Sequence, residues 1–310
     1  MNKYLRIPQY EPKGFPKDNI NKVQSLYRKS FGGRELTIPY IQWQMLQNPC
    51  LKERAVTLWQ GETLVGYNAL NSSPVILYGK KAICADSGNT MVDEEFLGAS
   101  IQLIQEVLRQ NKDIDIIIGF PNRNSFGIYV RYLHFPYVGD MAFWTAEAKD
   151  GIVSEEIKEF YSFTNEYEQL SWDLAKHHDF IKLRNMEFLN YRFFQKPEFD
   201  YKGYELIHNG VKHGYIIVDI YEENGIKQLQ VIDILADSIE VFKSLLKFAT
   251  QLAWQWNCPF VKLWLSSEFY KAALEESGFI YGEHPFRMIV FNQNLDLSKC
   301  YITLADSDIF

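Results

Sequence analysis

The sequence is poor in the features that mark membrane, secreted and nucleic-acid-binding proteins. Nowhere do 18 uncharged apolar residues run together, and the opening MNKYLRIPQYEPKG is broken by charges and prolines. The cysteines form no Cys-x-x-Cys pair, which argues against a zinc site or a disulfide framework; they are Cys50, Cys84, Cys258 and Cys300. The net charge is −7, and the 32 basic residues form no basic stripe. We expect a cytoplasmic protein with buried thiols and without a metal, membrane or nucleic-acid partner.

Motifs of several common enzyme classes are missing as well. The chain has no Gly-x-x-x-x-Gly-Lys, no Gly-x-Ser-x-Gly and no His-Glu-x-x-His sequence. His177 and His178 are adjacent and therefore face different sides of a helix or strand, so we expect them at the surface rather than around a metal. With 47% apolar residues among 310, the chain can bury the cores of two domains.

A repeat with an offset of 148 residues divides the chain. YIQWQMLQNP at 40–49 and FLNYRFFQKP at 188–197 place bulky residues and a proline at matching steps. Downstream, GETLVGYNAL at 61–70 corresponds to GVKHGYIIV at 210–218 with the same offset between their Gly-Tyr pairs. The repeat predicts two copies of one fold, at residues 1–150 and 151–310.

Hydrophobic periodicity predicts the order ααβββαβαβ in the first copy. The second copy repeats its main parts, and residues 148–180 join the two. We predict an α/β (α+β) protein in which each copy is a mixed, mostly antiparallel sheet flanked by helices. The expected strands are at 54–59, 63–77, 81–92, 114–120 and 138–146, then at 203–208, 212–221, 227–235, 259–265 and 286–292.

This order resembles the GNAT superfamily of N-acetyltransferases, and the repeat resembles its two-copy bacterial members. The resemblance implies that acyl-CoA lies where the third long strand splays from the next strand. Its pyrophosphate would bind backbone N–H groups of the loop that opens the following helix. The family loop reads Gln/Arg-x-x-Gly-x-Gly/Ala, so the implied acetyl-CoA contacts are Met91 and Val92 at the strand end, followed by Leu97, Gly98, Ala99, Ser100 and Ile101.

This loop departs from the family pattern at informative positions. Leu97 replaces the basic or amide residue, and Ser100 and Gln102 replace two small residues. Asp93, Glu94 and Glu95 precede the helix, where they suit its dipole but would repel a pyrophosphate. The residues alone leave two interpretations open, an acyl-CoA loop and an ordinary strand-to-helix junction.

The stretch IIIGFPNRNSFGIYVRYLHF at 116–135 resembles the next strand and helix of the same family. We expect one of Asn122 and Asn124 to cap the helix, and the other, with Ser125, to contact the pantetheine arm. Many family enzymes protonate the leaving thiolate with a tyrosine five residues before the closing aromatic. That position is Val130 here, so the flanking Tyr129 and Tyr132 become the candidates, although both also suit ordinary packing.

The sequence offers two sources for a general base. Asp86 is the acidic residue within an apolar strand, where burial favours the neutral carboxyl group. Asp306 and Asp308 belong to the ending LADSDIF, which resembles the acidic endings of two-copy members but also suits a solvated tail. We rank Asp86 first, because a strand positions a side chain better than a tail does.

The second copy lacks a glycine at its own strand-to-helix junction. There ADSIEVFKS offers Asp237 and Ser238 as ordinary helix caps, so we expect this copy to bind no CoA and to hold the acceptor. We predict an acyl-CoA-dependent N-acyltransferase that uses acetyl-CoA and a small-molecule amine, such as an amino sugar or polysaccharide precursor. The alternatives are a catalytically degenerate scaffold protein and a peptidoglycan-bridge-type aminoacyl transferase, and the oligomeric state is unpredicted.

Overall fold

The computed structural model describes residues 9–33, 35–96, 98–152 and 154–307. Two predicted site residues, Leu97 and Asp308, lie outside these ranges. The described strands form one 14-stranded sheet along the path β1-β2-β3-β4-β5-β13-β6-β12-β11-β10-β9-β7, to which β8 and β14 attach through β3. No helix in the described ranges is long and apolar enough to span a membrane.

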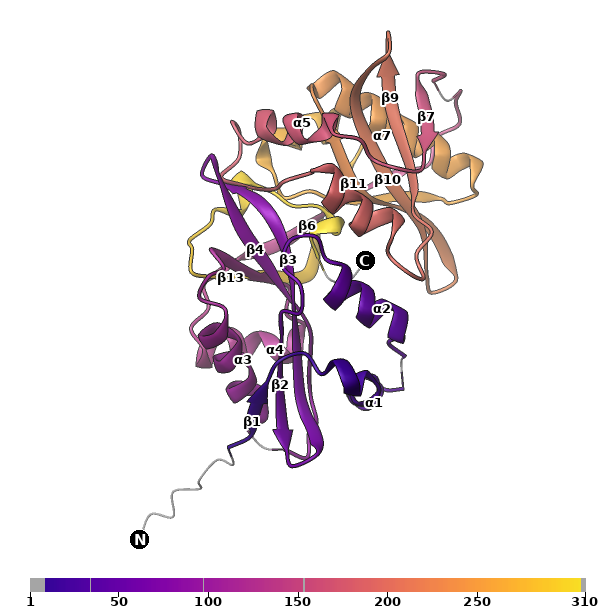
Figure 1. The fold of residues 1–310 in the computed structure, drawn as a ribbon. Coiled ribbons are helices and arrows are strands. Elements are labelled where there is room, and N and C mark those ends of the chain that lie inside the picture. The colour runs from indigo at the N-terminus through magenta and orange to yellow at the C-terminus, as the bar shows by residue number, and fades with distance from the viewer. Residues whose placement is uncertain (1–8, 34, 97, 153, 308–310) are drawn as a thin grey trace.

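The first half has mostly antiparallel strands with helices on both faces. β3 pairs with β2 and β4, while β5 runs parallel to β4. Figure 1 shows α1 and α2 on one side of these strands and α3 with α4 on the other. The elements are β1 (Glu11–Lys13), α1 (Ile20–Ser30), α2 (Ile38–Gln42), β2 (Ala55–Gln60), β3 (Thr63–Leu77), β4 (Lys80–Val92), α3 (Ala99–Gln110), β5 (Ile116–Gly119), α4 (Arg123–Gly127) and β6 (Tyr137–Glu147).

The second half repeats this arrangement more fully than the sequence predicted. Residues 148–180 are not a simple connection, because they contain β7 and α5, and α5 precedes α6 as α1 precedes α2. The strand expected at 286–292 is β13, which begins six residues earlier, at Ile280. The elements are β7 (Ile157–Phe160), α5 (Glu166–Leu174), β8 (Phe180–Lys182), α6 (Met186–Leu189), β9 (Lys202–His208), β10 (Val211–Glu223), β11 (Ile226–Ala236), α7 (Ile239–Gln255), β12 (Phe260–Trp264), α8 (Lys271–Glu276), β13 (Ile280–Phe291) and β14 (Cys300–Tyr301).

Corresponding residues of the repeat meet at the centre of the molecule. The Trp43 indole Nε1 donates a hydrogen bond of 3.0 Å to the Tyr191 carbonyl oxygen, 148 residues away. The two rings stack with 4.6 Å between their centroids. The repeat seen in the sequence is thus realised as a direct contact between its two copies.

The halves exchange their closing strands. β13 of the second half lies between β5 and β6, and β6 of the first half pairs on its other side with β12. The sheet therefore continues across the expected boundary near residue 150. Each half depends on the other to complete its sheet.

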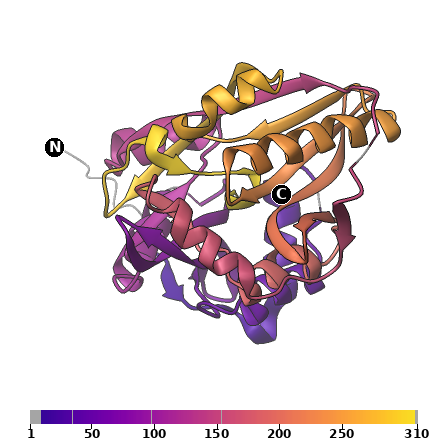
Figure 2. The same cartoon turned by 90° about the horizontal axis from the view of Figure 1, so that it is seen from above.

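The C-terminal segment lies inside the protein, contrary to a solvated tail. β14 pairs with β8, and the turn Leu304–Asp306 is buried. In Figures 1 and 2 this yellow segment passes between the two halves. Cys84, Cys258 and Cys300 are buried free thiols as expected, and Cys50 is half-buried.

The surface position expected for the histidine pair is wrong for His178. This side chain is buried, and its ring nitrogens lie 2.7 Å from the Leu174 carbonyl oxygen and 2.7 Å from Ser267 Oγ. Only His177 is exposed. Burial lowers the pKa of His178, although the hydrogen bond to Leu174 opposes the shift.

This burial predicts a pH-dependent stability. An imidazole with a lowered pKa in the folded state binds its proton more readily when unfolded, so the free energy of unfolding should fall as pH drops below about 6.5. The slope from this group is at most about 1.4 kcal/mol per pH unit. Urea unfolding between pH 5 and 8 should show a smaller slope for His178→Gln than for His177→Gln. Equal slopes for both variants would contradict the assignment.

Candidate active site

β4 and β5 separate soon after they meet. Their pairing covers only Cys84–Asp86 of β4 and Ile116–Ile118 of β5. Beyond this point β4 carries one extra residue against β3, and Asn89 adopts a left-handed backbone with φ of 50°. Such a bulge bends a strand away from its neighbour. A cleft of about 300 Å³ opens between the strands, lined by Ser87, Asn89, Thr90, Gly119, Phe120 and Asn122 among others.

The two candidate tyrosines lie in different environments. Tyr129 is 7% exposed and lines the cleft, and its Oη is 3.4 Å from Thr90 Oγ1. Tyr132 is 70% exposed. Both belong to the π-helical turn η3 (Ile128–Tyr132), three positions apart. The structure therefore brings Tyr129, and not Tyr132, to the cleft.

Asn122 is the helix cap. Its Oδ1 accepts hydrogen bonds of 3.0 Å from the backbone N–H groups of Asn124 and Ser125. Asn122 and Ser125 both line the cleft, whereas Asn124 is exposed and is not among the described lining residues. Of the residues at the start of α4, Ser125 therefore faces the cleft and Asn124 faces solvent.

The junction before α3 contains the expected glycine turn. Gly98 caps the helix with φ of 79°, a conformation that few other residues adopt without strain. Ala99 and Met91 are buried, while Val92, Ser100 and Ile101 are half-buried. Met91 and Val92 are the last residues of β4, and Gly98 to Ile101 form the start of α3. None of them lines the described cleft.

The acidic residues before α3 have a cationic partner. Lys29 Nζ on α1 lies 2.8 Å from Asp93 Oδ2 and 3.2 Å from Glu95 Oε1. This lysine offsets the repulsion that two carboxylates would exert on a phosphate. Gln102, which replaces a small residue of the family pattern, exchanges two hydrogen bonds with the backbone of Tyr10.

Asp86 forms a buried ion pair. Its Oδ2 lies 2.6 Å from Nζ of Lys182 on β8, and both side chains are almost fully buried. Burial alone would lower the pKa of Lys182, but the negative charges of Asp86 and Asp306 raise it above its ordinary value. Asp86 is thus held by Lys182 beside Ser87, where the cleft begins.

Asp306 is part of a structural network. Its Oδ2 lies 3.2 Å from an Arg184 guanidinium nitrogen and accepts hydrogen bonds from the backbone N–H and the hydroxyl of Thr303. Arg184 also pairs with Asp233, 3.0 Å away. Asp86 and Asp233 lie near the ends of corresponding apolar runs, and both are paired with a cation. Lys182, the partner of Asp86, ends β8, and Arg184, the partner of Asp233, follows two residues later. The sequence offered one signal for these cations, since Lys182 and Arg184 interrupt the apolar stretch FIKLR.

A small cavity adjoins Asp86 on the side of the second half, and a larger groove shares one lining residue with it. The small cavity, of about 30 Å³, is lined by Asp86, Lys182, Asn71 and Phe188 among others. An open groove of about 490 Å³ runs from there between the halves, and Phe188 lines both. The described residues include no group of three or more His, Cys, Asp or Glu side chains that could hold a metal ion.

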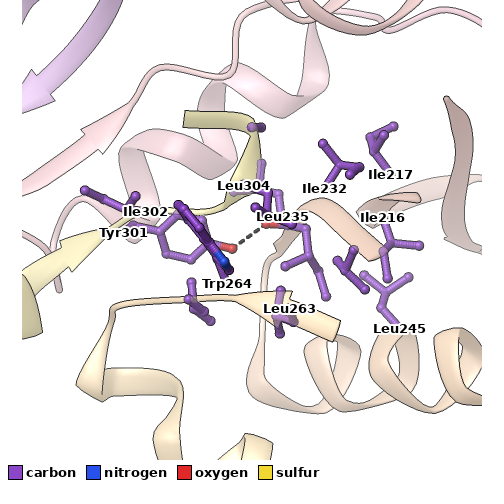
Figure 3. Close-up of a cluster of buried hydrophobic side chains, with 14 of the residues drawn as sticks. Ile216, Ile217, Ile232, Leu235, Leu245, Leu263, Trp264, Tyr301, Ile302 and Leu304 are labelled. Carbon is purple, nitrogen blue, oxygen red and sulfur yellow. Dashed lines mark hydrogen bonds between the residues drawn. The ribbon is translucent and has the colours of Figure 1, made fainter. Parts of the chain in front are cut away.

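The corresponding gap in the second half is filled. β11 pairs with β12 only over Leu229–Val231, so these strands also separate. Tyr301 Oη donates a hydrogen bond to the carbonyl oxygen of Ile234 on β11, and Ser266 after β12 donates to the Cys300 carbonyl oxygen. Figure 3 shows Tyr301, Ile302 and Leu304 packed among the side chains of both strands. Ser238 caps α7 as expected.

Comparisons of the fold agree with this geometry. No protein-family model and no curated protein sequence matches the chain. A GCN5-related N-acetyltransferase from Anabaena variabilis matches with a TM-score of 0.68 and 14% identity over 91% of this chain and 72% of that chain. A probable N-acyltransferase from Enterococcus faecalis matches with a TM-score of 0.67, 14% identity and the same coverage of 91% and 72%.

A larger enzyme shares the arrangement too. N-myristoyltransferase of Saccharomyces cerevisiae, solved with bound myristoyl-CoA, matches with a TM-score of 0.62 and 12% identity over 93% of this chain and 79% of that chain. At these identities the likeness concerns the fold. The predicted fold class is confirmed: the chain has the mixed α/β fold of the GCN5-related N-acetyltransferases, in two tandem copies.

Proposed function

We propose that the protein is an acyl-CoA-dependent N-acyltransferase that holds acetyl-CoA in the cleft between β4 and β5. The observation that carries this proposal is the difference between the halves. Both pairs of strands separate, yet one gap is open and the other is filled by Tyr301–Leu304. On the cleft side, β4 beyond Asp86 has no described strand partner, so its backbone can pair with the amides of a pantetheine chain.

The residues around the cleft suit transfer to an amine. Bound acetyl-CoA would supply the acyl thioester. Tyr129, with its hydroxyl in the cleft, would protonate the leaving thiolate. Asp86 would take a proton from the incoming amine, directly or through one water, and Lys182 would hold its carboxylate in place.

The second half would supply the acceptor side. The groove between the halves ends at Phe188 next to the Asp86 cavity, so an amine entering there would approach the cleft from the side opposite the cofactor. Its mixed lining of Cys50, Lys81, Asp115 and Glu187 suits a polar small molecule, which agrees with the amino-sugar class. Asp86 lines the small cavity next to this groove, whereas Asp306 is bound to Arg184 and Thr303 and does not line it, so Asp86 is the preferred base.

Calorimetric titration with acetyl-CoA tests the proposal directly. We expect one site per chain with a dissociation constant in the micromolar range, because the gap between β4 and β5 is open whereas Tyr301 and Leu304 occupy the gap between β11 and β12. Release of CoA thiol in the presence of a panel of amino sugars would then identify the acceptor. Absence of binding at millimolar acetyl-CoA would favour a scaffold role, and two equivalent sites would refute the proposed asymmetry.

A further inference from the structure

The side chains at the end of β5 alternate between the two faces of the sheet. Ile117 packs in the core cluster that contains the buried face of α3, and a Cβ atom at Gly119 would lie 3.5 Å from the Ile289 side chain. Ile118 and Phe120 point the other way, because Ile118 belongs to the core cluster that spans both halves and Phe120 packs against that cluster. Phe120 directly follows the last residue of β5.

Phe120 shares its face of the sheet with Asp86. In the parallel pairing of β4 and β5, Asp86 lies opposite Ile118, so both side chains point to the same face. Phe120 comes two residues later and lines the cleft. The ring of Phe120 therefore borders the cleft on the Asp86 face of the sheet.

Buried aromatic side chains from other strands support this ring. The Phe120 ring centroid lies 5.9 Å from that of Trp264 on β12, which is fully buried. Trp264 in turn lies 5.5 Å from Phe143 of β6 and 5.3 Å from Phe286 of β13, measured between ring centroids. Phe286 lines the cleft together with Phe120. Because close-packed side chains yield little, these rings form a fixed apolar wall at this side of the cleft.

The direction of a bound acyl group follows from the two faces of the sheet. In the proposed function the pantetheine arm passes Asn122 and Ser125 of α4, which lies on the face opposite α1 and α2. Asp86 would act on the amine from the other face, so the thioester carbon lies between the two. The remainder of the acyl group then extends toward Phe120. The cleft measures only about 300 Å³ and must hold the pantetheine arm as well.

We propose that Phe120, supported by Trp264, is a specificity-determining residue that restricts the donor to short acyl groups such as acetyl and propionyl. The fold alone does not impose this limit, because the N-myristoyltransferase that shares it was solved with myristoyl-CoA. One extra methylene in a closed apolar pocket changes selection by about 10- to 200-fold. The inference rests on the proposed function, since it names the acyl groups that the same cleft accepts.

The test compares the dissociation constants of CoA, acetyl-CoA and octanoyl-CoA, measured by calorimetry. The unmodified protein should bind octanoyl-CoA at least about 10-fold more weakly than acetyl-CoA. Phe120→Ala should remove this difference, because the octanoyl chain can occupy the space left by the ring, while CoA and acetyl-CoA stay within about twofold. Phe120→Leu keeps more of the packing against Trp264 and should change the ratio in the same direction by a smaller factor.

Phe126→Ala is the matched control. It removes the same ring from α4, where Phe126 packs edge-on against Tyr137 and is not among the described residues that line the cleft. The ratio of the octanoyl-CoA and acetyl-CoA dissociation constants should remain that of the unmodified protein.

Four results would overturn the inference. The unmodified protein could bind both acyl-CoA compounds equally, or both Phe120 variants could keep its ratio. The ratio could change as much in Phe126→Ala, or the Phe120 variants could weaken all three probes alike, as a purely structural residue would. Absence of binding of any probe to the unmodified protein would instead refute the proposed function, and the acyl-chain limit with it.

Discussion

Ser125→Trp should lower the affinity for acetyl-CoA by about 100-fold or more, equivalent to at least about 2.7 kcal/mol. Ser125 lies in the first turn of α4 and lines the cleft, so an indole there would occupy the space assigned to the pantetheine arm. The helix cap should survive, because the backbone N–H groups of Asn124 and Ser125 both donate to Asn122 Oδ1, and only the additional 3.2 Å bond from the Ser125 hydroxyl is lost. Calorimetry with acetyl-CoA measures the effect.

Asn124→Trp is the matched control. It adds the same side chain one residue earlier, at an exposed position outside the described lining of the cleft. We expect its affinity to stay within about twofold of the unmodified protein. If both variants bind acetyl-CoA normally, the cofactor does not use this cleft. If Asn124→Trp alone loses affinity, the cofactor covers the outer surface of α4 and the earlier prediction for Asn124 stands.

Lys182→Met should destabilise the protein by about 3–5 kcal/mol. Lys182 is 2% exposed and bridges Asp86 of the first half and the Asp306 carbonyl oxygen of the C-terminal segment. Removal of its charge leaves Asp86 buried without this partner and severs a link between three parts of the chain. Urea unfolding followed by circular dichroism gives the free energy of unfolding.

The double variant Asp86→Leu with Lys182→Met separates the ion pair from the packing. Because the carboxylate is removed together with the ammonium group, we expect it to recover most of the lost stability. A double variant as unstable as Lys182→Met alone would show that the aliphatic stem of Lys182, and not its charge, carries the effect. Both variants should bind acetyl-CoA if folded, since neither residue lines the β4–β5 cleft.

Local patterns in the sequence predicted most of the fold. The 148-residue repeat is realised in the contact between Trp43 and Tyr191, and the long strands β3, β4, β10 and β11 end within three residues of their predicted positions. Alternating or continuous apolar residues define such strands without help from distant parts of the chain. The glycine turn at Gly98 and the cap at Asn122 are likewise local features that a short motif reveals.

Features that depend on contacts between distant residues could not be predicted in the same way. The exchange of β6 and β13 is decided by pairing across the whole sheet, and nothing in either strand specifies its partner. The burial of LADSDIF depends on Arg184 and Thr303, which make an acidic tail compatible with the interior. The choice between Tyr129 and Tyr132 was undecided because a π-helical turn changes which residues share a face.

A crystal structure with bound CoA would show where the cofactor lies. We expect the pantetheine arm between residues 87–90 of β4 and the end of β5, the sulfur within hydrogen-bond reach of Tyr129 Oη, and the pyrophosphate at the first turn of α3. The gap between β11 and β12 should remain filled by Tyr301 and Leu304. CoA bound between β11 and β12, or found outside the β4–β5 cleft while that cleft stays empty, would contradict the account.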